Sequence, residues 1–454
     1  MTEQVDVAVV GAGVAGLAAG VESLGRGLTV RVLEAAGRSG GVVGTVAKDG
    51  YRFEEGPNAF LVKAPARAFL ERAGLLDRVV AAGNEASSRF LFLDGELQAV
   101  PSSLASAVRS PLLTTSGKLR VLREAFVTGG DPTDESVAEF VTRRLGPEAL
   151  ARLVAPFLVG VYAGDERKLG AEAVFPALVE WERARGSIVR GALAGMFRRG
   201  APRGLRGSHS APGGLGGLVA ALTDRLADRI QTGARVASLG RDEAGWRIEA
   251  GGAETVRARA VVMAAPAWAA ADLMRPLDSE AAELLEKIEY GPMVSVALAV
   301  DPAALRHAPR GFGFLVPREA GLDLLGGLFM SRVFPDRAPP GRELVMAMIG
   351  GARWPDAVTA PDDDILRRVG QGLERTLGHR EEPTPLGIQR WLRGVPQPGR
   401  DHPRRVRRLR ERAAALGPLV LAGGYLDGIG LGDALASGAV AAGELADALE
   451  AAPS

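Results

Sequence analysis

The 454-residue sequence predicts an α/β protein in which a Rossmann-like nucleotide-binding domain carries an inserted mixed β-sheet domain and an inserted helical domain. Near the N-terminus, residues 9–20 (VVGAGVAGLAAG) join an apolar run to a glycine-rich turn and a helix pattern. Residues 417–449 repeat this combination at the far end of the chain. Between them the pattern is helical over 102–200 and strand-like over 288–351, which places the insertions in the middle.

The composition is typical of a folded globular protein and excludes several function classes. Apolar residues make up 47% and charged residues 24% of the chain, whose length predicts two or three domains. The net charge of +1 argues against a dedicated nucleic-acid-binding protein. The absence of cysteine excludes disulfides, iron–sulfur clusters and thiol catalysis. The four histidines lie in expected loops and lack ligand spacing, so no metal site is predicted.

The N-terminal residues MTEQVDVAVV do not have the basic start and longer apolar run of a signal peptide. No apolar run reaches the length of a membrane-spanning helix. We therefore expect a cytoplasmic protein, with peripheral contact to the cytoplasmic face of the membrane as an open alternative.

The first glycine motif has the spacing of a dinucleotide-binding turn. Gly11 suits the tight turn, Gly13 the close approach of a phosphate, and Gly16 the packing of helix on strand. The helix start offers N–H groups to a diphosphate. Glu34 ends the second predicted strand, where a carboxylate can accept ribose hydroxyls. The contacts predicted here are Gly11, Ala12, Gly13, Val14, Ala15, Gly16, Glu34 and Ala35. The alternative is a tight turn that binds nothing.

The residues after Glu34 distinguish FAD from NAD. EAAGRSGGVVGT carries an arginine and two further glycines, and YRFEEGPNAF follows at 51–60. This arrangement resembles the second fingerprint of the FAD-dependent amine oxidase and protoporphyrinogen oxidase superfamily, and the resemblance implies FAD. The alternative reading of GRSGG is an ordinary flexible loop. The implied contacts are Arg38, Gly40, Gly41, Val42, Gly56, Pro57, Asn58 and Ala59.

The C-terminal glycine motif supports the same cofactor. A helix that starts near Gly428, Ile429 and Gly430 can aim its N–H groups at the flavin pyrimidine oxygen. Two glycine-rich helix starts at opposite ends of one chain favour a single cofactor held from both sides. The alternative is a helix that only closes the domain.

Over essentially its whole length, the sequence resembles the oxygen-dependent protoporphyrinogen oxidase family. The motifs that carry the resemblance are RLGPEALARLVAPFLVGVYAGD, GFGFLVP, FPDRAP, IGGAR, VPQ and GGYLDGIGLGDAL, together with those above. The resemblance implies oxidation of protoporphyrinogen IX to protoporphyrin IX, the penultimate step of heme biosynthesis. Six electrons pass to oxygen, and hydrogen peroxide is released.

The resemblance also implies the roles of single residues. Arg89 matches an arginine that pairs with a substrate propionate, and Asn58 lies at the edge of flavin and substrate. Gly160 matches a glycine against which the substrate edge rests. Val236 and Trp391 fall where the family contacts the cofactor. A surface arginine that flanks a strand is the alternative for Arg89.

Phe312, Leu315 and Met348 match the apolar side chains that sandwich the tetrapyrrole rings. The physical argument agrees, because a porphyrinogen is mostly apolar with carboxylates on one edge and needs an apolar slot with one cation. An arginine can hold a carboxylate by two hydrogen bonds. No general base is required, since hydride leaves a methylene bridge and the proton goes to solvent. All three residues could instead be ordinary core.

The expected domains follow from the two ends of the chain. The FAD-binding domain comprises 1–85, 210–275 and 415–454, and the substrate-binding domain comprises 86–100 and 276–414. Residues 101–209 form a helical domain that is a candidate for membrane association. The partners expected are the tetrapyrrole and O2, with hand-over to a ferrochelatase as a further candidate, and the protein is a monomer or homodimer.

Two segments depart from the family pattern. Gly424 and Ala434 replace the usual Asn or Ser and Cys of the C-terminal motif, and Pro398 stands in place of a tyrosine.

Residues 198–217 are rich in Gly, Pro, Ser and Arg and predict an exposed, mobile linker. The basic run 400–412 predicts a solvated helix, with anionic lipid as the alternative partner.

Three rival functions remain open at this point. Coproporphyrinogen III oxidation would require a more cationic site, because that substrate has four propionates. An amine oxidase would require an aromatic cage, and only Tyr425 lies near Gly424. A non-catalytic FAD-binding protein would not need the apolar positions and the arginine.

Overall fold

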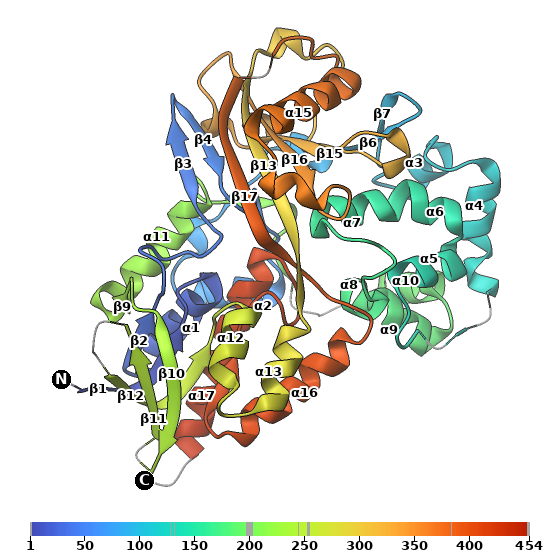
Figure 1. Cartoon of the computed structure of the whole chain (residues 1–454). Coiled ribbons are helices and arrows are strands. Elements are labelled where there is room, and N and C mark those ends of the chain that lie inside the picture. The colour runs from blue at the N-terminus through green and yellow to red at the C-terminus, as the bar shows by residue number, and fades with distance from the viewer. Residues whose placement is uncertain are drawn as a thin grey trace.

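The computed structural model describes residues 2–127, 129–130, 132–196, 203–243, 245–251, 255–382 and 384–451. Two seven-stranded sheets form two lobes, and a group of helices lies beside the second sheet (Figure 1). Both ends of the described chain belong to the first lobe. The predicted α/β class with a Rossmann-like lobe is therefore confirmed.

The first sheet has the strand order β10-β11-β12-β1-β2-β9, with β18 beside β12. Its strands are β1 (Thr2–Val10), β2 (Val30–Leu33), β9 (Ile230–Gln231), β10 (Val236–Asp242), β11 (Gly245–Ala250), β12 (Thr255–Met263) and β18 (Leu419–Leu421). Alternate residues of β1 enter two cores, since Val7 and Val9 pack on one side and Ala8 and Val10 on the other.

Helices cover both faces of this sheet, as a buried parallel sheet requires. One core includes α1 (Val14–Gly25), α2 (Ala64–Arg72), α11 (Leu215–Leu226) and α17 (Leu431–Ala451). The other includes α12 (Ala267–Met274), α13 (Ser279–Glu286) and α16 (His402–Ala415). The helix α17 packs tightly on α1, because a Cβ on Gly438 would lie 1.9 Å from the carbonyl oxygen of Ala15.

The second sheet has the order β17-β13-β16-β15-β14-β6-β7. Its strands are β6 (Arg89–Leu93), β7 (Glu96–Ala99), β13 (Glu289–Val300), β14 (Gly313–Leu315), β15 (Leu324–Phe329), β16 (Glu343–Gly350) and β17 (Thr384–Gln397). The helix α15 (Asp362–Leu377) packs on one face. The long strands β13 and β17 run from this sheet towards the first lobe (Figure 1).

The helical group comprises α3 (Leu104–Arg109), α4 (Thr115–Leu122), α5 (Val137–Leu145), α6 (Pro147–Ala149), α7 (Ala155–Tyr162), α8 (Ala171–Val174), α9 (Pro176–Arg185) and α10 (Ile188–Met196). A π-helical turn, Leu150–Val154, leads into α7. Ser136 caps α5 in a capping box with Glu139, and Gly146 ends that helix at a positive φ.

Short elements connect the lobes. Two small sheets pair β3 (Thr45–Lys48) with β4 (Tyr51–Glu54), and β5 (Val80–Ala81) with β8 (His209–Ser210); α14 (Met330–Val333) follows β15.

The prediction of an exposed, mobile linker over 198–217 is wrong for the part that the structure describes. Residues 198–202 lie outside the described chain. The rest of the predicted linker is ordered, since Ser208 to Ala211 are buried and α11 begins at Leu215.

The predicted loop position is confirmed for His307 and His379 and is wrong for His209 and His402. His209 lies in β8, His402 begins α16, and both are buried, as is His379. The serine neighbours of His209 concealed a core position that the backbone pairing of β8 with Phe60 and β5 creates.

Candidate active site

The first glycine turn has the geometry that a dinucleotide requires. Gly11 adopts a φ of +103°, and a Cβ on Gly16 would lie 1.9 Å from the Gly11 carbonyl oxygen, so both positions need glycine. A Cβ on Gly13 would meet no heavy atom within 4 Å. Gly13 is the N-cap of α1, and no side chain of the described residues caps this helix start, which suits the binding of a phosphate by the first-turn N–H groups.

Glu34 lies directly beside this turn. Its carboxylate accepts hydrogen bonds from the backbone N–H of Ala12 at 2.6 Å and of Ala36 at 2.7 Å. The N–H of Ala234 donates to the Glu34 carbonyl, which brings the segment leading to Val236 next to Glu34. The predicted nucleoside contacts are therefore grouped at one end of the turn.

The second glycine loop packs on the segment that precedes Asn58. Arg38 forms an ion pair with Glu55 at 3.0 Å and donates to the Val43 carbonyl, also at 3.0 Å. A Cβ on Gly56 would lie 2.2 Å from the Val42 carbonyl oxygen. Ala12 and Gly40 are joined by a backbone hydrogen bond of 2.7 Å, so this loop also closes against the first turn.

The start of α17 meets the same segment from the other side. A Cβ on Gly432 would lie 2.2 Å from the Leu61 carbonyl oxygen. Gly428, Ile429 and Gly430 precede the helix, and the Ala434 N–H donates to the Gly430 carbonyl at 2.9 Å. The departure Ala434 is thus an ordinary helical position, and Gly424 lies half-buried beside this loop.

The departure Pro398 lies elsewhere. Its carbonyl accepts the N–H of Gly170 at 2.9 Å, which ties the end of β17 to the helical group.

These residues fit FAD. The phosphate region is bare of side chains at Gly13, and Gly41 approaches it so closely that a Cβ would lie 3.3 Å from the Gly13 Cα. The Oδ1 of Asn58 is buried without a hydrogen-bond partner among the described residues. A buried amide oxygen without a partner is costly and indicates a group that is still to be bound there.

The predicted substrate residues lie on the face of the second sheet opposite α15. Ser295, Met348, Gly326 and Leu315 are cross-strand neighbours on β13, β16, β15 and β14, and we call them the site row. The adjacent β13 residues Val294 and Val296 enter the core under α15, so Ser295 faces the other way.

The helix α7 closes over this row. A Cβ on Gly160 would lie 2.3 Å from the Leu315 side chain, and Val159 packs on Met348 in one apolar cluster. The structure therefore brings Gly160, Leu315 and Met348 together.

Arg89 lies at the edge of the same surface. Its guanidinium carbon is 5.1 Å from the centroid of the Phe312 ring, and one N–H donates to the Ser208 hydroxyl at 3.5 Å. Arg89 is exposed, whereas Ser208 is buried. No other hydrogen bond of the Arg89 guanidinium is found among the described residues, so its remaining N–H groups can bind a carboxylate.

Trp391 connects the sheet to the flavin loop. Its indole N–H donates to the Glu55 carbonyl at 2.7 Å, and on the sheet it is paired with Met293 of β13. Trp391 therefore lies between the predicted cofactor contacts and the site row.

Sequence reasoning missed three apolar residues around this site. Phe157 and Val161 lie on the same side of α7 as Gly160 and are 41% and 43% exposed, and Leu61, which follows Asn58, is 54% exposed. Exposed apolar side chains on α7 and in the loop after Asn58 suit a surface that a ligand covers. The helical spacing of Phe157 and Val161 was visible, but it does not distinguish a buried face from an exposed one.

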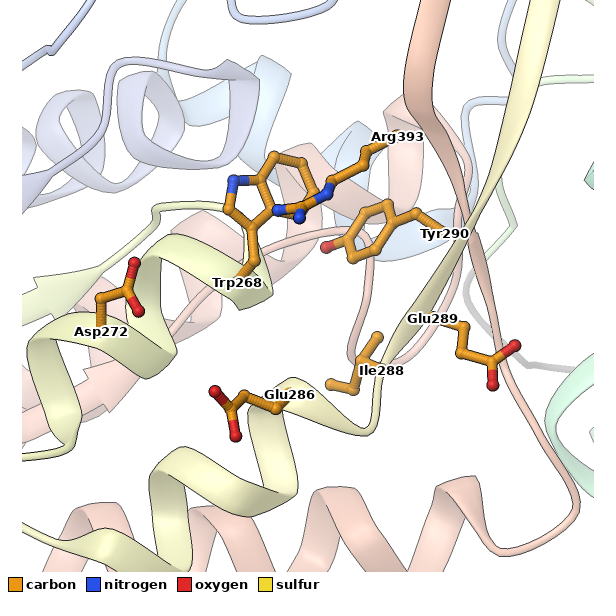
Figure 2. Close-up of a pocket in the computed structure, with 7 residues that line it drawn as sticks. All are labelled: Trp268, Asp272, Glu286, Ile288, Glu289, Tyr290 and Arg393. Carbon is orange, nitrogen blue, oxygen red and sulfur yellow. The ribbon is translucent and has the colours of Figure 1, made fainter. Parts of the chain in front are cut away.

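A separate pocket of about 450 Å³ is lined by Trp268, Asp272, Glu286, Ile288, Glu289, Tyr290 and Arg393 (Figure 2). The Arg393 guanidinium lies 5.0 Å from the Trp268 ring centroid, and Trp268 meets Tyr290 edge-on at 4.6 Å. None of the predicted substrate residues lines it, and its carboxylates do not suit an anionic substrate.

Comparison with known proteins agrees with this geometry. The Flavin containing amine oxidoreductase family matches residues 14–446. A chloroplastic protoporphyrinogen oxidase from Nicotiana tabacum is 32% identical over 94% of this chain and 83% of its own length. A coproporphyrinogen III oxidase from Propionibacterium freudenreichii subsp. freudenreichii is 31% identical over 98% of this chain and 92% of its own.

A crystal structure of an Exiguobacterium sp. 255-15 protein, assigned by its name to the protoporphyrinogen oxidases, superposes with a TM-score of 0.80 at 25% identity. The match covers 98% of this chain and 99% of that one. With a family match over nearly the whole chain, FAD is the cofactor, and the protein is an oxidoreductase. The chain belongs to the Flavin containing amine oxidoreductase family.

Proposed function

We propose that the protein oxidises protoporphyrinogen IX to protoporphyrin IX in three two-electron steps, each with one O2 as acceptor and one H2O2 as product. The observation that carries this proposal is Arg89, an exposed cation over Phe312 at the edge of an apolar surface. That surface is joined to the flavin loop through Trp391. An apolar macrocycle with propionates on one edge matches this arrangement.

The protein's own residues orient the substrate and keep the site dry. FAD, held by the two glycine loops and the start of α17, supplies hydride acceptance and reoxidation by O2. Arg89 holds a propionate by parallel hydrogen bonds and so fixes one edge of the macrocycle. Leu315 and Met348 contact the rings, and Asn58 accepts a hydrogen bond beside the reacting carbon. The substrate cation loses its proton to solvent, so no side-chain base takes part.

Coproporphyrinogen III is the second candidate substrate, which would give coproporphyrin III. The observation that favours it is the relative from Propionibacterium freudenreichii subsp. freudenreichii, which covers almost the whole chain. The placement of Arg89 over Phe312, where it can hold one carboxylate, favours the substrate with fewer carboxylates.

Porphyrin fluorescence tests the two candidates. Purified protein loaded with FAD is mixed in air with protoporphyrinogen IX or coproporphyrinogen III, and heat-inactivated protein corrects for autoxidation. We expect faster turnover of protoporphyrinogen IX. Faster turnover of coproporphyrinogen III would reverse the substrate assignment. No turnover of either substrate by protein that retains FAD would contradict the proposed function.

We also propose peripheral membrane contact through the helical group. Leu122 of α4 is 69% exposed and Phe126, in the following 3₁₀ turn Arg123–Phe126, is 84% exposed, with Leu119 beside them. Among the described residues, no helix has the length and apolar content needed to cross a bilayer. Exposed Arg123 suits anionic lipid headgroups.

Sedimentation with anionic vesicles tests this contact. The double variant Leu122→Ser and Phe126→Ser should remain in the supernatant while the wild type sediments. Equal sedimentation of both proteins would exclude this surface. Hand-over to a ferrochelatase, the oligomeric state and the three-domain division by residue number remain proposals.

A further inference from the structure

An ion pair across the start of α17 joins two segments that hold the flavin. The Lys63 ammonium lies 2.8 Å from the Asp433 carboxylate. Lys63 is the N-cap residue of α2 and follows the loop that contains Asn58. Asp433 lies in the first turn of α17, which the glycines 428 and 430 precede. The pair joins residues 370 positions apart in the chain.

The carboxylate of Asp433 folds back over the glycine loop. A Cβ on Gly428 would lie 2.7 Å from its Oδ2, and a Cβ on Gly430 would lie 3.0 Å from the same atom. Burial raises the pKa of Tyr162 to about 12, and the charge of Asp433 adds to this rise. Tyr162 ends α7, two residues after Gly160. Asp433 is therefore close to the loop predicted to face the flavin and to the helix predicted to face the substrate.

The charge of Asp433 opposes the expected function of this helix start. The N-terminus of a helix carries a partial positive charge that favours the negative charge a flavin gains on reduction. A carboxylate in the first turn cancels that effect at short range. Lys63 restores it, because the ammonium neutralises the carboxylate at hydrogen-bond distance.

We propose that Lys63 is a positioning residue for flavin reduction: by neutralising Asp433 at the start of α17, it makes the bound flavin easier to reduce. This inference rests on FAD binding and not on the identity of the substrate. The Lys63 side chain is 59% exposed and that of Asp433 only 22%. Salt ions therefore reach the ion pair from the lysine side, and they weaken the attraction between the two charges.

The test is the midpoint potential of the bound flavin, measured by equilibration with a reference dye and without porphyrinogen. Lys63→Met should lower the ratio of reduced to oxidised flavin at a fixed potential about tenfold, which is about 30 mV for a two-electron couple. Asp433→Asn should shift the potential in the opposite direction. The potential of the double variant should lie near that of the wild type, because no unbalanced charge then remains at the start of α17.

A matched control lies one turn further along α2. Arg67→Met removes the same charge from the same helix and breaks a pair with Glu71 (2.8 Å), but Arg67 is not bound to α17. It should leave the potential unchanged. Equal shifts in the Lys63 and Arg67 variants, a double variant that keeps the full shift of either single variant, or no shift in either single variant would overturn the inference. The potential does not depend on turnover, so failure of the proposed substrate leaves this result interpretable.

Discussion

In the proposed reaction, Arg89 binds a propionate carboxylate of the substrate. Its side chain is exposed, and its contacts are one ring and one hydroxyl, so its removal should affect binding and not stability. Arg89→Ala should reduce kcat/KM for protoporphyrinogen IX about 10- to 100-fold, because a charge-assisted pair of hydrogen bonds is lost. The kcat/KM of Arg89→Lys should fall between those of Arg89→Ala and the wild type. Steady-state fluorescence kinetics measures both.

The dimethyl ester of the same substrate provides the control for Arg89. It lacks the carboxylates, so wild type and Arg89→Ala should oxidise it at similar rates. If the alanine variant loses as much activity on the ester as on the acid, then Arg89 does not act through a carboxylate.

The sequence was most informative where the chemistry needs a particular residue type. Gly11 and Gly16 are required by backbone approach, and the positions of both were predictable from spacing alone. Lys63 and Asp433 could not be paired in advance, because no sequence pattern links residues from distant segments. The exposure of Phe157 and Val161 was also out of reach, since an apolar stripe on a helix usually faces a core.

At the scale of elements, Glu124 is the residue on which the helical group depends. Its carboxylate pairs with Arg144, and both side chains are fully buried. It also accepts the Ser187 hydroxyl and the N–H groups of Ile188 and Val189 at the start of α10. Burial alone would raise the pKa of Glu124, but the hydrogen bonds from Ser187, Val189 and Ile188 and the charge of Arg144 outweigh it and lower that pKa.

Glu124→Gln should therefore destabilise the protein by about 3 kcal/mol, because Arg144 is left buried without its counter-charge. Thermal unfolding followed by circular dichroism measures this loss. The flavin absorbance spectrum should not change, since the residue lies in the helical group. A fall in Tm below that of the wild type is required; an unchanged Tm would show that the buried pair contributes nothing to stability.

A second element-scale prediction concerns the start of α16. Burial lowers the pKa of His402 below its ordinary value of 6.5, partly offset by the Leu426 carbonyl, which lies 3.0 Å from Nε2. Well above pH 6.5 the imidazole of His402 is neutral in both the folded and the unfolded state. As the pH falls through 6.5 towards the folded-state pKa, only the unfolded state takes up the proton, so stability is lost.

Urea unfolding at several pH values from about 7.5 down to about 5.5 should show this loss, with a slope of up to about 1.4 kcal/mol per pH unit. His402→Gln should flatten the curve, because glutamine does not titrate and can still donate to Leu426. His209 is buried with a lowered pKa for the same reason and contributes in the same direction. A variant as pH-dependent as the wild type would exclude His402 as the cause.

Local signals predicted elements well, and long-range pairing caused the errors. The turn at Asp94 and Gly95 between β6 and β7, the cap at Ser136 and the stop at Gly146 follow from local residue chemistry. The ordered conformation of residues 203–217 does not follow from local residue chemistry, because it depends on the pairing of His209 with Phe60 and Ala81. The charges of α16 are similarly explained by partners elsewhere, such as Glu280 for Arg408.

At the scale of the whole molecule, the two lobes are joined by a buried ion pair. Glu54 of β4 and Arg337, in the 3₁₀ turn Pro335–Arg337, are 3.1 Å apart, and each is 1% exposed. Glu54 also accepts the Leu215 N–H at the start of α11. This contact and the long strands β13 and β17 should make the two lobes unfold as one unit.

Removal of FAD tests that coupling. Since the cofactor binds only the folded state, about 100-fold excess over its Kd should stabilise the protein by about 2.7 kcal/mol. Scanning calorimetry of the apoprotein with increasing FAD should show one transition whose Tm rises with the logarithm of FAD concentration. Two separate transitions, of which only one responds to FAD, would show that the lobes unfold independently.

The site row has a consequence for engineering. Each of its members comes from a different strand, and the next residue along β13 enters the core under α15. A library that varies Met348 and Leu315 would therefore change the face proposed to contact the macrocycle and leave the core under α15 in place, while each variant must still pack on Val159 and Gly160 of α7. Single-residue insertions in these strands are unsuitable, because a slip of one position exchanges the two faces of the sheet. If the site row contacts the substrate as proposed, substitutions on one strand at a time should change substrate preference.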